Sequence, residues 1–171
     1  MKQHSVNNYR VLAIDPTSKG FGFAVLERSE LVDYGIREAK GNKNSASLKK
    51  IADLIELYQP QIIVLENPTA KGSRRCLRVR ELIGEIKVLA SAKKVKTHSI
   101  SRLQVKKAFA FFGAVTKYQI AVEIAKRFPE LELRLPRIRK PWMSEDERMS
   151  IFDAGALALT YFKYINKAEG S

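Results

Sequence analysis

Residues 11–26, VLAIDPTSKGFGFAVL, contain two short apolar runs separated by a polar turn. The runs at 11–14 and 20–26 have the length and the β-branched and aromatic content of strands. Residues 17–20, Thr-Ser-Lys-Gly, have the length and composition of a hairpin turn. The stretch therefore predicts a hairpin in which Asp15 stands at the end of the first strand.

The rest of the chain alternates apolar runs typical of strands with segments of helical periodicity. The run Ile-Ile-Val-Leu before Glu66 is typical of a strand buried on both faces. The expected elements are strands at 31–37, 61–66 and 95–100, helices at 47–58, 79–90, 101–111, 116–128 and 144–164, and breaks at 41–45 and 129–141. This order predicts an α/β fold with a mixed five-stranded sheet, three antiparallel strands followed by parallel ones, flanked by helices.

Length and composition indicate an ordinary globular protein. The 171 residues are 45% hydrophobic, which fits a single domain over 1–171, and we expect residues 1–8 and 167–171 to be frayed. The one cysteine, Cys76, excludes an intramolecular disulfide framework and a zinc site built from cysteines. No stretch approaches the roughly 18 apolar residues of a membrane span. We therefore expect a soluble, cytoplasmic protein with no membrane partner.

The charge is strongly positive and unevenly distributed. The formal net charge is +13, and residues 71–107 hold twelve basic residues against two acidic ones. Segregation of this kind favours a polyanionic partner, above all nucleic acid. A well-solvated surface is the alternative, and a membrane-surface helix is a weaker one because the charges span several expected elements.

Three acidic residues occupy positions that are costly for an unpaired carboxylate. Asp15 and Glu66 end apolar strands, and Asp153 lies within an apolar helix. Each has an ordinary alternative: a turn residue for Asp15, and an ion pair with lysine or arginine for the other two. Adjacent strands would nevertheless place Asp15 beside Glu66, and the terminal helix could add Asp153. Clustered carboxylates beside a basic groove point to Mg²⁺ and to metal-assisted phosphodiester hydrolysis.

Four segments, in this order and spacing, resemble those of the RuvC-type Holliday-junction resolvases over roughly residues 9–163. They are an opening hairpin, a central acidic strand, a basic helix-loop-helix segment and an acidic terminal helix. Their sequences here are VLAIDP at 11–16 with GFGFAV at 20–25, IIVLE at 62–66, QVKKA at 104–108 with TKYQ at 116–119, and DAGALA at 153–158.

The resemblance implies a ribonuclease-H-like fold and a homodimer that nicks two strands of a four-way DNA junction with magnesium or manganese. It implies that Asp15, Glu66 and Asp153 are catalytic metal ligands. It also implies that lysines lie near the scissile phosphate. The expected DNA-binding residues are Lys71, Arg74, Arg75, Arg78, Lys106, Lys107 and Lys117.

The sequence departs from the family pattern in two places. The family usually has Asp or His three residues before the last acid, where this chain has Ser150. Asp146 is the nearest candidate for a replacement metal ligand, although a helix N-terminal role, beside a capping box of Ser144 and Glu147, is the stronger interpretation. The loop at 67–76 lacks the aromatic residue that family members often place there.

These observations leave three hypotheses for the function. The first is a metal-dependent, structure-selective DNA endonuclease that resolves Holliday junctions in recombination and repair. The second is a ribonuclease-H-like nuclease that acts on RNA, of the type that processes pre-ribosomal RNA. The third, prompted by Ser150, is a junction-binding protein whose catalytic site has degenerated.

Overall fold

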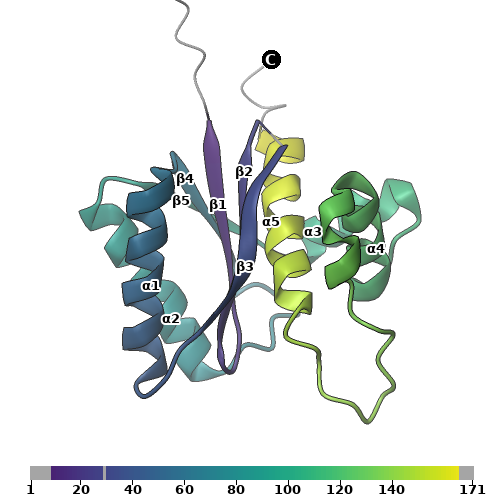
Figure 1. Cartoon of the computed structure of the whole chain (residues 1–171), viewed down its shortest axis with the longest axis horizontal. Helices are drawn as coiled ribbons and strands as arrows, with labels where there is room; N and C mark the ends of the chain where they lie inside the picture. The colour runs from purple at the N-terminus through teal and green to yellow at the C-terminus, as the bar shows by residue number, and fades with distance from the viewer. Residues whose placement is uncertain (1–8, 29, 166–171) are drawn as a thin grey trace, which may run out of the picture.

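A mixed sheet of five strands lies at the centre of the computed structural model, which describes residues 9–28 and 30–165 (Figure 1). The strands are β1 (Arg10–Pro16), β2 (Gly20–Glu27), β3 (Glu30–Glu38), β4 (Ile62–Glu66) and β5 (Lys96–Ile100). Their order is β3-β2-β1-β4-β5, with β1 to β3 antiparallel and with β4 and β5 parallel to β1. The expected mixed sheet is confirmed, whereas the expected frayed ends, 1–8 and 167–171, lie outside the described residues.

Helices cover both faces of this sheet. The helices are α1 (Lys43–Tyr58), α2 (Leu77–Ala92), α3 (Arg102–Phe109), α4 (Lys117–Arg127) and α5 (Met149–Ile165), with 3₁₀ turns η1 (Ala110–Phe112) and η2 (Pro129–Arg134). Helices α1 and α2 lie on one face, and α5 lies on the other with α3 and α4 beside it (Figure 1). None of the helices in the described part of the chain has the length and apolar content that a membrane crossing needs.

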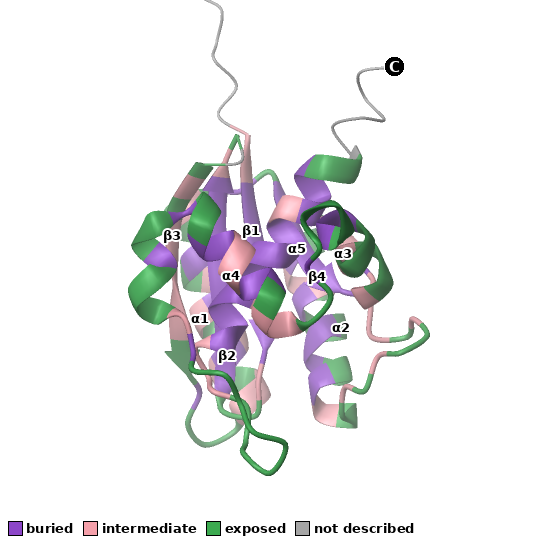
Figure 2. Ribbon diagram, turned by 90° about the vertical axis from the view of Figure 1, so that its right-hand side faces the viewer, coloured by how far each residue is buried: buried purple, intermediate pink, exposed green. Residues whose placement is uncertain are grey.

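Strand β1 is buried between two hydrophobic cores (Figure 2). Val11 and Ala13 pack into the core beneath α5, whereas Leu12 and Ile14 pack into the core beneath α1 and α2. Because side chains alternate along a strand, the next residue, Asp15, lies on the α5 face. Strand β4 follows the same alternation, so its last residue, Glu66, lies on that face too.

The two helices that carry cationic residues toward α5 begin with complete capping boxes. Ser101 caps α3 by accepting from the backbone N–H of Gln104, and Thr116 caps α4 by accepting from the backbone N–H of Gln119. In both boxes the glutamine side chain accepts from the backbone N–H of the capping residue. The starts of α3 and α4 are therefore specified by local sequence.

Helix α1 starts earlier than the sequence periodicity indicated. It begins at Lys43, not at residue 47, because Asn42 accepts a hydrogen bond from the backbone N–H of Ser45 and so caps the helix. Gly41, which precedes the cap, has φ of 69°. The polar break expected at 41–45 is therefore mostly the first turn of the helix.

Helix α5 starts later than expected, and the capping box of Ser144 and Glu147 does not form. The helix begins at Met149. The carboxylate of Asp146 accepts from the backbone N–H of Arg148 at 2.9 Å, and Glu147 forms an ion pair with Lys19 at 2.8 Å. These contacts hold the preceding residues in an irregular loop. The loop expected at 129–141 likewise contains the 3₁₀ turn η2.

Candidate active site

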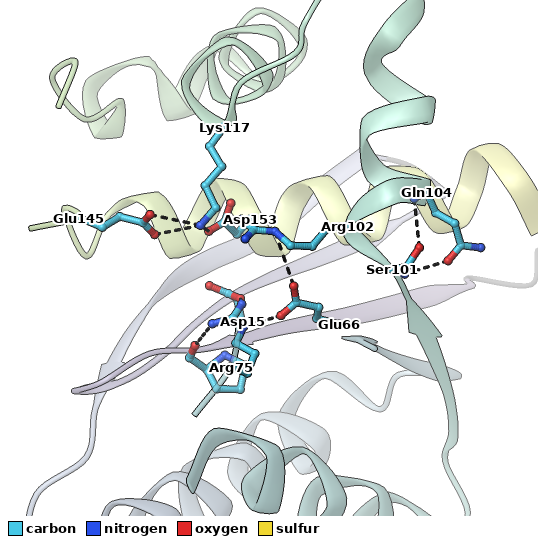
Figure 3. A network of polar contacts seen from close by, with 10 residues as sticks. Asp15, Glu66, Arg75, Ser101, Arg102, Gln104, Lys117, Glu145 and Asp153 are labelled. Atoms are coloured by element: carbon cyan, nitrogen blue, oxygen red, sulfur yellow. Dashed lines mark hydrogen bonds and ion pairs between the residues drawn. The ribbon is translucent and has the colours of Figure 1, made fainter. Parts of the chain in front are cut away.

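Three carboxylates converge at the edge of the sheet beneath α5 (Figure 3). Ile14 of β1 pairs with Leu65 of β4, so the following residues, Asp15 and Glu66, end neighbouring parallel strands. Both are buried, at 3% and 4% exposure. Asp153 projects from α5 into the same cavity of about 60 Å³. The expected juxtaposition of the three acids is therefore observed.

Arg75, from the segment between β4 and α2, occupies the space beside two of these acids (Figure 3). Its Nε donates to Glu66, and one terminal nitrogen donates to Asp15. The other terminal nitrogen donates to the backbone carbonyl of Pro16 at 2.9 Å. The guanidinium group thus faces inward, although the sequence pattern pointed to a DNA contact.

Lys117, the first residue of α4, joins the third acid to a fourth (Figure 3). Its Nζ lies 3.1 Å from Asp153 and 3.1 Å from Glu145. On the other side of the cavity, Nε of Arg102 lies 3.7 Å from Glu66. Every carboxylate of the site therefore has a cationic partner.

Burial shifts the proton affinities of these groups. It raises the pKa of Asp15 to about 7, against the opposing effect of Arg75 and with a smaller contribution from the negative charges of Asp153 and Glu66. Burial also raises the pKa of Asp153, and Lys117 opposes that shift. The pKa of Lys117 itself is raised, because Asp153 and Glu145 outweigh its own burial. Desolvation is therefore the main cause of the raised pKa values of Asp15 and Asp153, although both acids have cationic partners.

Ser150, at the position where the family usually has an acid, faces β2 and does not line the cavity. It is 2% exposed, and its hydroxyl donates to the carbonyl of Glu147 at 2.6 Å. Helix α5 lies so close to β2 here that a Cβ atom on Gly22 would be 2.3 Å from the Ser150 Oγ. An acid at position 150 would have to displace this contact.

The structure places Glu145 against Lys117 at the edge of the site, although Glu145 does not itself line the cavity, whereas the sequence analysis singled out Asp146. The carboxylate of Asp146 forms an ion pair with Arg148 at 2.6 Å and does not line the cavity. Glu145 carries no sequence signal of its own, since it stands in an irregular loop beside Asp146 and Glu147. Only the fold places it against Lys117.

The expected DNA-binding residues divide into three groups. Lys106 and Lys117 line the cavity, as do Arg75 and also Arg102, which the sequence analysis did not select. Arg75 and Arg78 are engaged within the protein, the latter with the carbonyl of Thr17 and the side chain of Asn44. The remaining three are exposed and do not line the cavity: Lys71, Arg74 and Lys107.

The acids are gathered but are not arranged as a finished metal site. Among residues 9–28 and 30–165, no three His, Cys, Asp or Glu side chains stand together in a geometry that would hold a metal ion. The guanidinium of Arg75 between Asp15 and Glu66 accounts for this arrangement.

The sequence and the fold are similar to those of known proteins. The model of the family described as crossover junction endodeoxyribonuclease RuvC matches residues 11–160. The RuvC protein of Caldanaerobacter subterraneus subsp. tengcongensis is 31% identical over 143 residues, which are 77% of this chain and 83% of that protein.

Two solved structures of Thermus thermophilus RuvC share the fold. One aligns with a TM-score of 0.68 at 18% sequence identity, and the alignment covers 94% of this chain and 97% of the Thermus chain. The other, in complex with a Holliday junction substrate, aligns with a TM-score of 0.66 at 17% sequence identity, and the alignment covers 93% of this chain and 96% of the Thermus chain. The ribonuclease-H-like fold implied by the resemblance is confirmed. From the family match and the relative at 31% identity, we conclude that this chain belongs to the RuvC family of crossover junction endodeoxyribonucleases.

Proposed function

We propose that this protein is a metal-dependent, structure-selective endonuclease that resolves four-way DNA junctions by hydrolysing phosphodiester bonds. The observation that carries the proposal is the convergence of Asp15, Glu66 and Asp153 on a cavity whose rim bears Lys106 and Lys117. Membership of the RuvC family supports it, as does the likeness to a relative in complex with a Holliday junction substrate.

The donor set of the cavity fits a hard divalent cation. Its anionic ligands are all carboxylate oxygens, which Mg²⁺ and Mn²⁺ accept together with water and phosphate oxygens. Burial is the main cause of the raised pKa of Asp15, and a bound cation would favour the ionised form of this carboxylate. We therefore assign Asp15, Glu66 and Asp153 as the metal ligands. Glu145 replaces Asp146 as the candidate fourth acid, because Lys117 joins it to Asp153.

Bound Mg²⁺ or Mn²⁺ would act as a Lewis acid, both for water attack on the scissile phosphate and for departure of the 3′ oxygen. The protein's own cations have a separate role in this proposal. Lys117 is held by two carboxylates, so its ammonium group is positioned before substrate arrives. It would stabilise the negative charge that develops on the phosphate, and Lys106 would bind a neighbouring phosphate.

We also propose that the protein acts as a homodimer, because paired nicks in a twofold-symmetric junction require two sites related by the same symmetry. Helix α2 offers a face for this contact. Leu77 and Val88 are 64% and 71% exposed, and the space beside Gly84 is open. A groove beside them is lined by α1 and α2 residues, including Leu48 and Leu89.

The decisive experiment incubates a labelled immobile four-way DNA junction with the protein in Mg²⁺, Mn²⁺ or chelator, beside duplex, single-strand and RNA controls. We expect paired nicks at the junction that require metal and disappear in Asp15→Asn, while junction binding remains. Full cleavage by Asp15→Asn would refute the site assignment. Preferential cleavage of RNA would favour the pre-ribosomal RNA processing type. Salt-sensitive binding without any nick would favour a degenerate binding protein.

A further inference from the structure

Arg75 makes contacts that would compete with a bound divalent cation. All three guanidinium nitrogens donate, to Glu66, to Asp15 and to the carbonyl of Pro16. The side chain is 24% exposed, so most of it is enclosed with the two acids. The second oxygen of Glu66 already faces Arg102. Arg75 thus occupies one oxygen of each acid, so a metal ion that takes ligands from both Asp15 and Glu66 competes with the guanidinium for their negative charge.

We infer that Arg75 is an exchangeable internal cation: it neutralises Asp15 and Glu66 in the metal-free protein and withdraws when a divalent cation binds. The inference rests on the metal site of the proposed function. A divalent cation supplies two charges where Arg75 supplies one, and it carries no conformational constraint from the chain. Like charges at one site repel, so binding of the metal disfavours retention of Arg75 in this contact.

The local backbone permits this movement. Arg75 lies in the irregular segment between β4 and α2, next to Cys76, whose side chain makes no capping hydrogen bond to α2. The segment is fixed at its two ends: Asn67 donates from its backbone to Ile100, and Arg78 binds the carbonyl of Thr17. Arg75 can thus leave the acids while both ends of the segment stay in place.

Withdrawal would give Arg75 a second role. Its partners in the metal-free protein include two buried carboxylates of the cavity where the scissile phosphate is proposed to bind. A guanidinium released from two carboxylates retains a planar set of donors that suits a phosphate group. We therefore assign Arg75 a DNA phosphate contact that forms only in the metal-loaded protein. Arg78, which is held by neutral partners, has no such dependence on metal.

Metal binding by the full chain without DNA tests the exchange directly. Mn²⁺ affinity, measured by electron paramagnetic resonance at pH 8, should be about 5- to 150-fold higher in Arg75→Gln than in the wild type, the usual range for coupling between two binding events. Arg74→Gln removes an equal charge from the preceding residue, which is exposed, and should leave Mn²⁺ affinity unchanged. Equal affinity in Arg75→Gln and the wild type would overturn the inference while leaving the metal site intact. Absence of Mn²⁺ binding in every variant would overturn the proposed function as well.

A measurement on the wild-type protein avoids any folding defect of the variant. The Nε–H of Arg75, assigned by its absence in Arg75→Lys, should give a protected NMR signal in chelator, because it donates to Glu66. That signal should move to the position of a solvated arginine as Mg²⁺ is added, in step with metal binding. Persistence of the protected signal at saturating Mg²⁺ would refute the exchange.

The salt dependence of junction binding tests the phosphate contact. In Ca²⁺, the slope of log affinity against log salt should be smaller for Arg75→Gln than for the wild type by about 0.9 per protomer, the value for one lost phosphate contact. In chelator the two slopes should coincide. If the slopes of the two proteins differ by the same amount in Ca²⁺ and in chelator, the phosphate contact of Arg75 does not depend on metal and this part of the inference is refuted.

Discussion

Gly22 of β2 lies directly against Ser150 of α5, with only 2.3 Å between the Ser150 Oγ and the place where a Cβ atom on Gly22 would be. Gly22 also pairs with Asp15 across the β1–β2 hairpin. One glycine therefore sets the distance between the helix that carries Asp153 and the strand that carries Asp15. The missing side chain at position 22 is a requirement of the site geometry.

Gly22→Ala should destabilise the protein by about 1–3 kcal/mol, the usual cost of overpacking a tightly packed core. It should also lower nuclease activity, because α5 must move away from β2. Urea unfolding and the junction assay measure the two effects. Gly155→Ala on α5 is the matched control: its added Cβ would meet Ile124 at an ordinary 3.6 Å, and alanine favours a helix. Equal stability of the two variants would contradict the packing argument.

Lys117→Met should lower kcat by about 10²- to 10³-fold, the usual loss when one donor to a developing negative charge is removed. Junction affinity should change little, because a single phosphate contact is lost among many. Single-turnover cleavage and equilibrium binding separate these two quantities. Lys126→Met, a change of equal charge at an exposed lysine of the same helix that pairs with Glu123, should cleave normally. A parallel loss of binding in Lys117→Met would contradict the catalytic role.

Glu145→Gln should weaken metal affinity about 10- to 100-fold, the range for residues that support a metal site. The physical reason is that Glu145 and Asp153 share Lys117. Asp146→Asn is the neighbouring control, since that carboxylate is paired with Arg148. Calorimetric titration with Mn²⁺ measures both variants. A larger effect from Asp146→Asn would restore Asp146 as the fourth acid.

The pH dependence of the free energy of unfolding should reflect the raised pKa of Asp15. Because burial raises its folded-state pKa from 3.8 to about 7, the folded protein holds the proton more tightly than the unfolded chain does. The resulting stabilisation is full below pH 4 and is lost as the pH rises to about 7. In chelator, the free energy of unfolding of the wild type relative to Asp15→Asn should fall over this window. Metal affinity should rise over the same window, because the metal requires the ionised carboxylate. A difference in the free energy of unfolding between the two proteins that does not change with pH would contradict the raised pKa of Asp15.

Val88→Glu should convert the proposed dimer to monomers, because it places a charge on the exposed face of α2. Sedimentation equilibrium measures the association directly. Val32→Glu, at a residue of β3 that is 42% exposed, should leave the dimer intact. A wild-type protein that is monomeric at the concentrations of the junction assay would remove the basis for the dimer.

Sequence periodicity was sufficient to predict the sheet, because the apolar runs of β1 and β4 are buried on both faces and have no pattern that indicates another element. The convergence of Asp15 and Glu66 also followed from the sequence, since parallel neighbouring strands end at the same edge. Capping residues predicted the helix start correctly where both hydrogen bonds of the capping box form, as at Thr116. Capping composition gave a wrong helix start at Ser144, because the residues there belong to a loop held by ion pairs of Asp146 and Glu147.

The parts of the site that the sequence could not supply depend on contacts between distant segments. The inward orientation of Arg75 results from its approach to Asp15, sixty residues away in the chain. Glu145 reaches the site only through Lys117 on another element. In a segment with twelve basic residues, composition predicts a charged surface but does not distinguish an arginine that faces solvent from one that faces carboxylates.

The position of β1 between two cores has a consequence for how the protein opens. An element whose side chains are divided between both cores can separate from its neighbours only when both cores are disrupted, so its amide protons should be protected up to the free energy of global unfolding. Helices α3 and α4 contribute buried residues to only one of the two cores, so their local opening should cost less free energy. Asp15 should therefore stay fixed on the last part of the molecule to unfold, even where a helix that carries Arg102, Lys106 or Lys117 opens locally.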